Sequence, residues 1–325
     1  MSSLSDWRVP PSVRPRPADY DYDLEAALSS VVALRAEVPS DAFTAGALGT
    51  ERAGNGVVIR ASGLVLTIGY LITEAETVWL QTANGRTTPG HALAYDHETG
   101  FGLVQALGAL DVPPLPLGRS GEASVGEYVV VAGAGGRQRS VAARIVAKQE
   151  FAGYWEYVLD DAIFTAPAHP HWGGAALIGP KGDLLGIGSL QLEQRREPDI
   201  VQHINMIVPI DVLKPALEDL LTFGRPNRPP RPWLGLYAAE IEDKVAIVGL
   251  AKGGPAQQAD LRQGDIILAA GGVAATTLLA LFRRMWSLGA AGVAVPLTVL
   301  RDGETFELRV VSGDRNSYLK KPRLH

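Results

Sequence analysis

Residues 54–69 have the sequence GNGVVIRASGLVLTIG, and this stretch decides the fold of the first part of the chain. Two short runs rich in valine, leucine and isoleucine flank the turn-forming residues Ala61–Gly63. This pattern predicts two antiparallel strands joined by a tight turn. The stretch VWLQTANGRTTPGHALAYD at residues 78–96 repeats it as a second hairpin, with Asn84–Gly85 as the turn.

Short apolar segments continue beyond these hairpins at intervals of about ten residues, with glycine between them, which predicts a barrel or a sandwich. We expect strands at Gly102–Ala106, Tyr128–Ala132, Ala142–Ala147, Tyr157–Leu159, Ala175–Ile178, Leu184–Gly188 and Ile204–Pro209. A short helix capped by Asp23 should precede the strands and turn into a strand at Val31–Val32. A helix over Ile210–Phe223 should follow them, with Pro215 tolerated near its start.

Changes in composition divide the chain into five parts. A mainly β domain at 21–223 and an α+β domain at 233–313, a small β-sandwich with two helices, are joined by GRPNRPPRP at 224–232, which has the composition of a linker. Residues 1–20 are rich in proline and arginine and are expected to form a disordered arm. Residues 314–325 form a polar, basic tail.

The bulk composition excludes several classes of function. A length of 325 residues suits two domains, and a net charge of -5 argues against a nucleic-acid partner. The absence of cysteine excludes disulfides, thiolate metal sites and a cysteine nucleophile. No motif indicates a cofactor. No apolar run has the length of a signal peptide or a membrane span, so we expect a cytoplasmic protein as written, or a periplasmic one if a leader is missing.

Ordered motifs of the first domain resemble the HtrA (DegP-like) family of trypsin-fold serine proteases. They are GNGVVI at 54–59, HALAYDHETGFGLVQ at 91–105, VPPLPLGRSGEASVGEYVVVAG at 112–133 and HPHWGGAALIGPKGDLLGIGSL at 169–190. The resemblance implies a trypsin-like double β-barrel. It also implies a homotrimer, or a mixed oligomer with an active homologue.

The second domain resembles a PDZ domain. The motifs are WLGL at 233–236, GPAQQADLRQGDIIL at 254–268 and RDG at 301–303. A PDZ domain adds an extended peptide to a sheet edge and offers loop N–H groups to the terminal carboxylate. The resemblance therefore implies binding of peptides or protein C-termini by Leu234, Gly235 and Leu236. A helix over 276–288 would line the groove with Leu278 and Phe282.

The triad of a serine protease needs a hydroxyl, an imidazole that takes its proton and a carboxylate that orients the imidazole. By the resemblance, these positions fall on Trp172, Tyr70 and Gly100 respectively. A phenol titrates near 10 and is a poor proton acceptor at neutral pH, glycine has no side chain, and an indole only donates. Loss of such a unit costs about a factor of 10⁶ in turnover. We therefore expect no catalytic residues at these positions and no enzyme activity.

Other chemically active residues give weaker signals. His169 and His171 flank Pro170, but alternate residues of an extended loop point to opposite sides, so no metal site is predicted. Ser189 and Thr165 are candidate replacement nucleophiles, without a base at a readable spacing. The aromatic run Phe151–Tyr157 covers a barrel end or forms a surface for a partner.

Two hypotheses remain. In the first, the chain is a catalytically inactive HtrA-like protein that binds peptides or protein termini through its PDZ domain. It would act as an adaptor, a chaperone-like holder or a regulatory subunit. In the alternative, it is a serine-type endopeptidase whose active site has been relocated or is completed by a partner.

Overall fold

The structure, a computed structural model, describes residues 7–197 and 200–320. These residues form two compact units. The first contains the described residues up to Gln149 together with Asp161–Pro226, and the second contains Glu150–Asp160 together with Asn227–Lys320. The short segment Glu150–Asp160 thus belongs with the C-terminal unit, although sequence places it inside the first domain. Each unit is described separately below.

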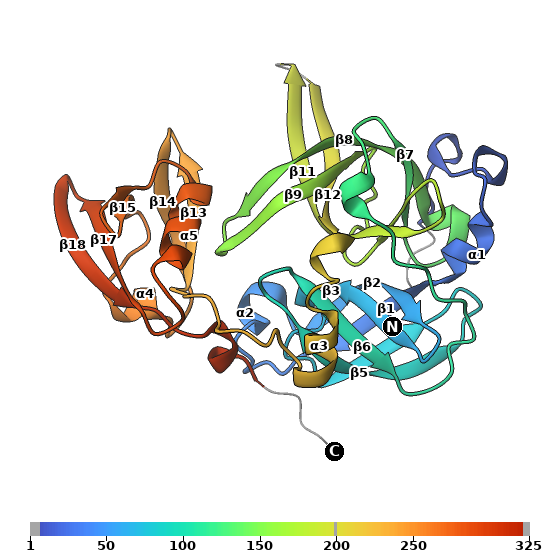
Figure 1. The fold of residues 1–325 in the computed structure, drawn as a ribbon, viewed down its shortest axis with the longest axis horizontal. Coiled ribbons are helices and arrows are strands. Elements are labelled where there is room, and N and C mark those ends of the chain that lie inside the picture. The colour runs from blue at the N-terminus through green and yellow to red at the C-terminus, as the bar shows by residue number, and fades with distance from the viewer. Residues whose placement is uncertain (1–6, 198–199, 321–325) are drawn as a thin grey trace. The chain divides into compact units, whose positions relative to one another are not determined.

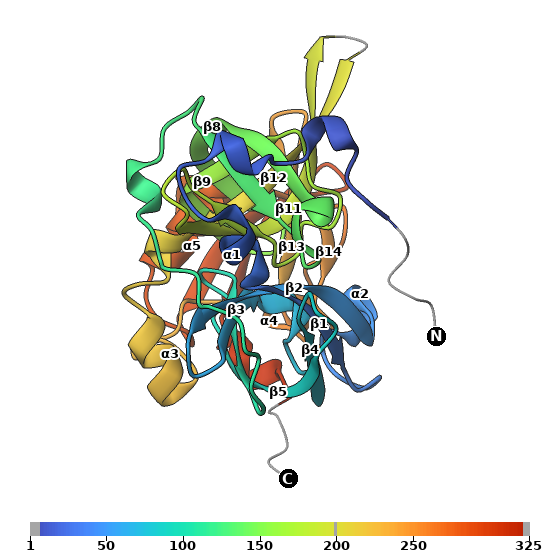
Figure 2. The same ribbon diagram turned by 90° about the vertical axis from the view of Figure 1, so that its right-hand side faces the viewer.

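Two closed six-stranded barrels make up the first unit, as predicted for a mainly β, trypsin-like domain (Figures 1 and 2). The strands of the first barrel run, in spatial order, β1 (Val31–Glu37), β2 (Glu51–Arg60), β3 (Leu64–Ile68), β6 (Phe101–Ala106), β5 (Thr87–Tyr95) and β4 (Thr77–Gln81). Those of the second run β10 (Ala176–Ile178), β11 (Leu184–Glu197), β12 (Ile200–Pro209), β9 (Tyr157–Ala166), β8 (Ser140–Gly153) and β7 (Tyr128–Ala132). The yellow pair β11 and β12 extends well beyond its barrel in Figure 1.

The predicted hairpin at 54–69 is present as β2 and β3. Val57 pairs with Leu66, and the register shifts between Val58 and Arg60. Val57, Val65 and Leu66 are fully buried, so this hairpin supplies the apolar interior that holds the first barrel together.

The N-terminal segment differs from the disordered arm expected for 1–20; residues 1–6 lie outside the described part of the chain. Pro11–Val13 and Pro17–Asp19 form 3₁₀ turns, η1 and η2. Val9 is fully buried in the apolar cluster of the second barrel, and its N–H donates to the Gln138 carbonyl at 2.8 Å. The composition of residues 1–20 suggested disorder because they contain few large apolar residues. Val9 nevertheless packs into the interior of the second barrel, and this fixes the segment around it.

The helices are shorter than predicted. Helix α1 (Leu24–Ser29) is capped by the Asp23 side chain and passes into β1 as expected. The helix predicted over Ile210–Phe223 is divided into a 3₁₀ turn, η6 (Ile210–Val212), and helix α3 (Leu217–Phe223). Pro215 lies between them, and because proline lacks an N–H and its ring clashes with the preceding turn, a continuous helix is blocked there. Helix α2 (Ala45–Leu48) is a single turn in the β1–β2 connection.

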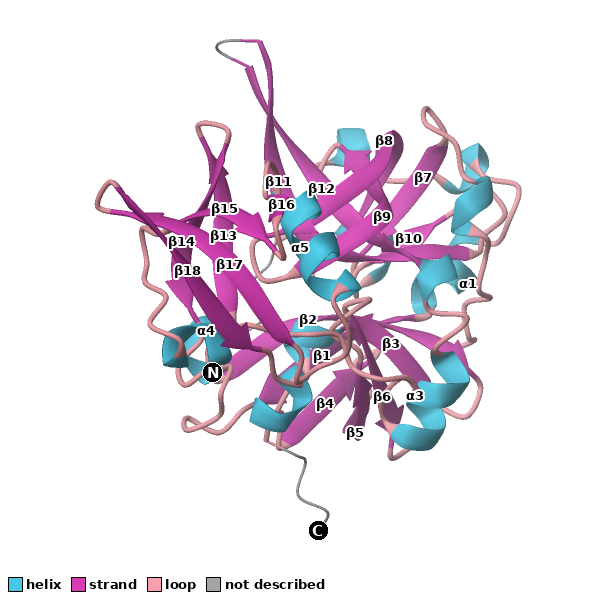
Figure 3. Ribbon diagram, turned by 60° about the vertical axis from the view of Figure 1, so that its left-hand side comes forward, coloured by secondary structure: helices cyan, strands magenta, loops and turns pink. Residues whose placement is uncertain are grey.

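A five-stranded antiparallel path forms the sheet of the second unit, ordered β13 (Leu236–Ile241), β14 (Lys244–Leu250), β15 (Ile266–Ala270), β17 (Ala294–Arg301) and β18 (Glu304–Val311). A short strand, β16 (Val273–Ala274), pairs with β15. Two helices, α4 (Pro255–Gln258) and α5 (Leu278–Ser287), complete the predicted α+β domain (Figure 3). Strand β13 ends the sheet path, so one of its edges is not paired with another strand of this sheet.

Candidate functional site

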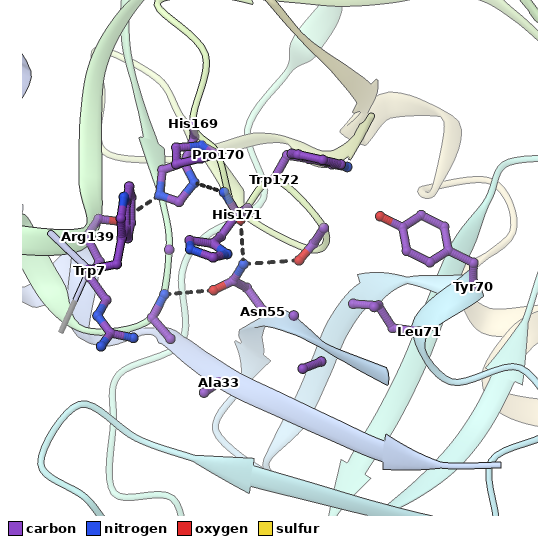
Figure 4. Close-up of a pocket in the computed structure, with 15 residues that line it drawn as sticks. Trp7, Ala33, Asn55, Tyr70, Leu71, Arg139, His169, Pro170, His171 and Trp172 are labelled. Atoms are coloured by element: carbon purple, nitrogen blue, oxygen red, sulfur yellow. Dashed lines mark hydrogen bonds between the residues drawn. The ribbon is translucent and has the colours of Figure 1, made fainter. Parts of the chain in front are cut away.

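A cleft of about 360 Å³ lies in the double-barrel unit (Figure 4). Its lining comes from strands β1 and β2, from the turn at Tyr70 and from the loop before β10. The aromatic, polar and charged side chains that line the cleft include those of Trp7, Asn55, Tyr70, Arg139, His169, His171 and Trp172. The cleft thus collects two of the three residues predicted at triad positions.

Tyr70 is held by its hydroxyl. It lies in the 3₁₀ turn η3 (Gly69–Leu71), and its Oη atom donates to the Ser189 carbonyl at 3.0 Å. Burial raises the pKa of the Tyr70 phenol well above its usual range, and a hydrogen bond with the Trp172 side chain offsets this only in part. The phenol therefore stays protonated at neutral pH and acts as a donor rather than a base.

Gly100 ends a tight turn directly before β6, where its N–H donates to the Asp96 carbonyl at 2.7 Å. Its carbonyl accepts from the Gly69 N–H at 2.7 Å, and its φ of 86° lies in the left-handed region that favours glycine. The neighbouring Asp96 is buried, and its carboxylate accepts from the Glu98 N–H at 3.0 Å and the Thr99 hydroxyl at 2.8 Å. This carboxylate stabilises its own turn. That the family's triad positions fall on Tyr70, Gly100 and Trp172 stays a prediction.

Asn55 organises the loop that carries Trp172. Its side-chain amide donates to the carbonyls of His171 and Gly173, each at 3.0 Å, and its Oδ1 accepts from the Ala134 N–H at 2.9 Å. Gly174, which follows Gly173 in this loop, has a φ of 75°, and a Cβ at this position would lie 1.8 Å from the Asn55 carbonyl oxygen. The loop therefore requires glycine at 174, and Asn55 fixes its path past the cleft.

His169 is a structural histidine. It is fully buried, its Nε2 lies 2.8 Å from the Arg139 carbonyl, and its Nδ1 accepts from the His171 N–H at 3.0 Å. Asn205 brackets its backbone: Oδ1 accepts from the His169 N–H at 2.6 Å, and Nδ2 donates to the His169 carbonyl at 3.1 Å. Burial lowers the pKa of His169 to about 4, so the ring is neutral and both nitrogens are engaged by the backbone.

His171 presents an imidazole to the cleft. The residue is exposed, and its ring makes an edge contact with Trp7 at 4.7 Å between centroids. Partial burial, with a contribution from the Arg139 charge, lowers the pKa of His171 below its usual 6.5. At neutral pH this ring is uncharged and able to accept a proton.

The two candidate replacement nucleophiles are buried. Ser189 is 4% exposed, and Thr165 is fully buried with no hydrogen-bond partner for its hydroxyl in the described chain. Neither belongs to the set that lines the cleft. The structure therefore gives neither hydroxyl a place in the cleft wall.

A second site lies in the C-terminal unit, at the loop before β13. The backbone N–H groups of Leu234, Gly235 and Leu236 converge on the carboxylate of Glu156. The nitrogen-to-oxygen distances are 3.0 Å from Leu234 to Oε2, and 2.6 Å and 2.8 Å from Gly235 and Leu236 to Oε1. Burial raises the pKa of Glu156 to about 7, and the three amides and Arg315 oppose that rise.

Leu278 and Phe282, predicted to line the groove, lie on α5. Leu278 is 7% exposed and Phe282 fully buried. Both belong to the apolar cluster of the second unit, which also contains Leu234, Leu236 and Val158. The structure thus brings the five predicted groove residues into one region.

Sequence reasoning missed two residues that organise these sites, Asn55 and Glu156. Asn55 lies inside the GNG motif at 54–56, where an amide between glycines could have been noticed. Glu156 is the one charged residue in the aromatic run 151–157. Its partner amides are 78 to 80 positions away, and no local pattern indicates such a pairing.

Comparison with known proteins supports both halves of the resemblance. Residues 54–187 match the trypsin-like peptidase domain family, and residues 232–311 match the PDZ domain family. A probable periplasmic serine endoprotease DegP-like from Pseudomonas fluorescens is 27% identical over 80% of this chain and 56% of its own length. The protein of the same name from Hahella chejuensis is 25% identical over 68% of this chain and 49% of its own. The chain thus spans about half the length of these relatives.

Solved structures agree on the fold. The HtrA-type protease AlgW with tripeptide has a TM-score of 0.52 at 20% identity, covering 93% of this chain and 99% of that one. The serine endoprotease from Yersinia pestis has a TM-score of 0.52 at 21% identity, covering 90% and 98%.

These comparisons correct one prediction. The expectation that this chain is not an enzyme is wrong, because the relatives aligned with it are named serine endoproteases. The expectation rested on three positions, and the comparisons rest on alignments that span most of the chain. In this chain a region that matches the trypsin-like peptidase domain family is followed by a region that matches the PDZ domain family, and this arrangement is similar to that of HtrA-type proteases.

Proposed function

We propose that this protein is a serine-type endopeptidase that recognises protein C-termini through its PDZ domain. Its active centre is relocated from Tyr70, Gly100 and Trp172, or is completed by a partner. The observation that carries the recognition step is the convergence of three N–H groups, from Leu234, Gly235 and Leu236, on one carboxylate. Because a peptide C-terminus carries a carboxylate, this loop has the chemistry to bind it.

Peptide-bond hydrolysis is inferred from the relatives that are named serine endoproteases. Their names also place them in the periplasm, and we extend that compartment to this chain as part of the proposal. None of the helices in the described residues combines the length and the apolar character that a bilayer crossing requires.

Within the cleft, His171 is the group suited to general-base work. Its imidazole is neutral at pH 7 and lines the cleft. The proposal assigns to it the proton of an incoming hydroxyl, with the serine nucleophile supplied by a rearranged loop or by a second chain, such as a homologue in a mixed oligomer. His169 is unsuited to this task because both its ring nitrogens are already bonded.

A fluorophosphonate probe combined with a fluorogenic casein assay tests the proposal. We expect one labelled serine, in this chain or in a co-purified homologue, and casein cleavage that falls in His171→Ala. His203→Ala is the matched control, because His203 is an exposed histidine outside the cleft lining. Absence of both labelling and cleavage, with and without an added C-terminal peptide, contradicts the endopeptidase reading.

A further inference from the structure

The segment Glu150–Asp160, here called the hairpin tip, joins β8 to β9 and belongs to the PDZ unit. We propose that the hairpin tip is an internal ligand of the PDZ groove, which an external C-terminus must displace before it can bind. The proposal rests on the recognition of C-termini proposed above. Four independent contacts support it.

The first contact is the carboxylate. Glu156 is 8% exposed, and its two oxygens accept from all three amides of the loop before β13. A terminal carboxylate has the same charge and the same pair of oxygens. With Glu156 in place, the donors that would bind such a group are satisfied.

The second contact is with the edge strand. The N–H of Ala238, on β13, donates to the Tyr154 carbonyl at 2.9 Å. The rings of Tyr154 and Tyr237 lie 5.9 Å apart between centroids. The backbone of the tip therefore begins to pair with β13, at the sheet edge where an extended peptide would add.

The third contact is apolar. Val158 is buried as a member of the PDZ cluster that includes Leu236 and Phe282, and Ala152 packs against this cluster. Val158 is the one buried member of that cluster from the hairpin tip. It supplies the apolar side chain that a bound peptide would otherwise supply, so we expect displacing peptides to end in a residue such as valine.

The fourth contact is with helix α5. Arg283 forms ion pairs with Asp160, at 2.5 Å between Nη2 and Oδ1, and with Glu150. These carboxylates stand at the two ends of the hairpin tip. The tip is thus held at its base by α5 and at its apex by the loop and by β13.

The backbone conformation of Glu156 indicates that glutamate occupies this position because of its carboxylate. Its φ is 59°, a conformation that residues other than glycine rarely adopt. The rings of its two sequence neighbours, Trp155 and Tyr157, stack on each other, with 5.4 Å between centroids and an interplanar angle of 17°. A turn that needs only a left-handed residue would take glycine or asparagine, whereas this one carries a carboxylate that fits the loop.

Tethering gives the hairpin tip an advantage over a free peptide. A ligand on the same chain competes at an effective concentration of the order of millimolar. The intact protein should therefore bind free C-terminal peptides much more weakly than a form in which the tip cannot seat.

Fluorescence polarisation on the full chain tests this, with labelled peptides that end in valine and carry either a free carboxylate or an amide. Glu156→Asn keeps a residue that tolerates the left-handed turn but removes the charge and shortens the reach. We expect it to bind the free-carboxylate peptide at least about tenfold more tightly than the wild type. Glu304→Gln, at an exposed site in the same unit, should match the wild type, and the amide peptide should bind none of the three proteins.

Amide hydrogen exchange without peptide provides an independent measurement. The amides of Leu234, Gly235 and Leu236 should exchange faster in Glu156→Asn than in the wild type and the Glu304→Gln control. Equal peptide affinity in wild type and Glu156→Asn overturns the internal-ligand proposal while leaving C-terminal recognition standing. No peptide binding in any protein, despite faster exchange in the variant, contradicts C-terminal recognition itself. Unchanged exchange contradicts the seating of the tip.

Discussion

The Oε1 atom of Glu156 lies 2.6 Å from the backbone nitrogen of Gly235, although the residues are 79 positions apart. Glu156 belongs to the hairpin between β8 and β9, and Gly235 belongs to the loop that begins the PDZ sheet. Within the C-terminal unit, the Glu156 carboxylate thus connects the hairpin tip to the loop that would otherwise bind a C-terminus.

Peptide binding by the wild type should strengthen as the pH rises from 5.5 to 7.5. The pKa of seated Glu156 is about 7, above the usual 4.5, so seating takes up a proton between these values and becomes weaker as the pH approaches 7. Because the peptide and the hairpin tip compete for the same amides, weaker seating of the tip makes the apparent affinity for the peptide higher. Polarisation titrations across this range measure the effect.

Glu156→Gln is the control for this pH dependence. Arg315 and Tyr237 are among the groups that face Glu156. The charge of Arg315 lowers the pKa of Glu156. Burial is the main cause that raises the pKa of Tyr237 above its usual 10, well above the pH range of the titration. The Tyr237 phenol does not change charge between pH 5.5 and 7.5. In Glu156→Gln, peptide affinity should therefore change with pH only through the titration of the peptide itself. If the variant keeps the full pH dependence of the wild type, another group causes the effect.

Loss of the α5 contact should loosen the tip mildly. Arg283→Ala removes ion pairs whose side chains are partly exposed, at 45% and 83% for Arg283 and Asp160. Because water screens such exposed pairs, each contributes little, so peptide affinity should rise by a few-fold at most, less than for Glu156→Asn. Arg309→Ala, at an exposed site on β18, should leave the affinity unchanged, and a similar rise there would point to net charge instead.

His169→Ala should destabilise the double-barrel unit. The substitution removes the acceptor of the His171 N–H and the partner of the Arg139 carbonyl. The Arg139 carbonyl keeps its hydrogen bond from the Gly133 N–H at 3.0 Å, so the main loss is the acceptor of the His171 N–H, and leaving one such group unsatisfied costs about 1–3 kcal/mol. Chemical denaturation followed by tryptophan fluorescence measures the loss. His203→Ala, at an exposed position, should change stability little, and equal effects would contradict the structural role of His169.

The same histidine predicts acid sensitivity. Its pKa is about 4 in the folded protein and near 6.5 when unfolded. The unfolded chain therefore binds more protons between these values, and the stabilisation from keeping the ring neutral is lost as the pH falls from 6.5 towards 4. Thermal melts of wild type and His169→Ala should converge towards pH 4, and parallel pH profiles would rule out His169 as the cause.

Most of the fold could be predicted from local pattern. The hairpin of β2 and β3 was predictable because two short apolar runs on either side of a glycine turn leave few other ways to bury Val57 and Leu66. Pro215 was judged tolerable in a helix that it in fact divides, because sequence alone does not fix where a helix begins. Val9 was assigned to a disordered arm because its burial depends on a site formed by distant strands.

The candidate sites were less predictable. The loop amides at Leu234–Leu236 could be placed by their motif, but their acceptor, Glu156, is reached only through the folded chain. Asn55 is similar, since its bonds to the carbonyls of His171 and Gly173 span more than 100 positions. Hydrogen bonds between segments this far apart have no periodicity for sequence reasoning to detect.

The proposal that the hairpin tip is an internal ligand of the PDZ groove can be tested by the structure of the full chain bound to a valine-ended peptide with a free carboxylate. We expect the peptide's terminal carboxylate to replace that of Glu156 at the amides of Leu234, Gly235 and Leu236, with Val158 withdrawn from the PDZ cluster. A structure in which the peptide is bound while Glu156 keeps its hydrogen bonds to those amides would contradict it.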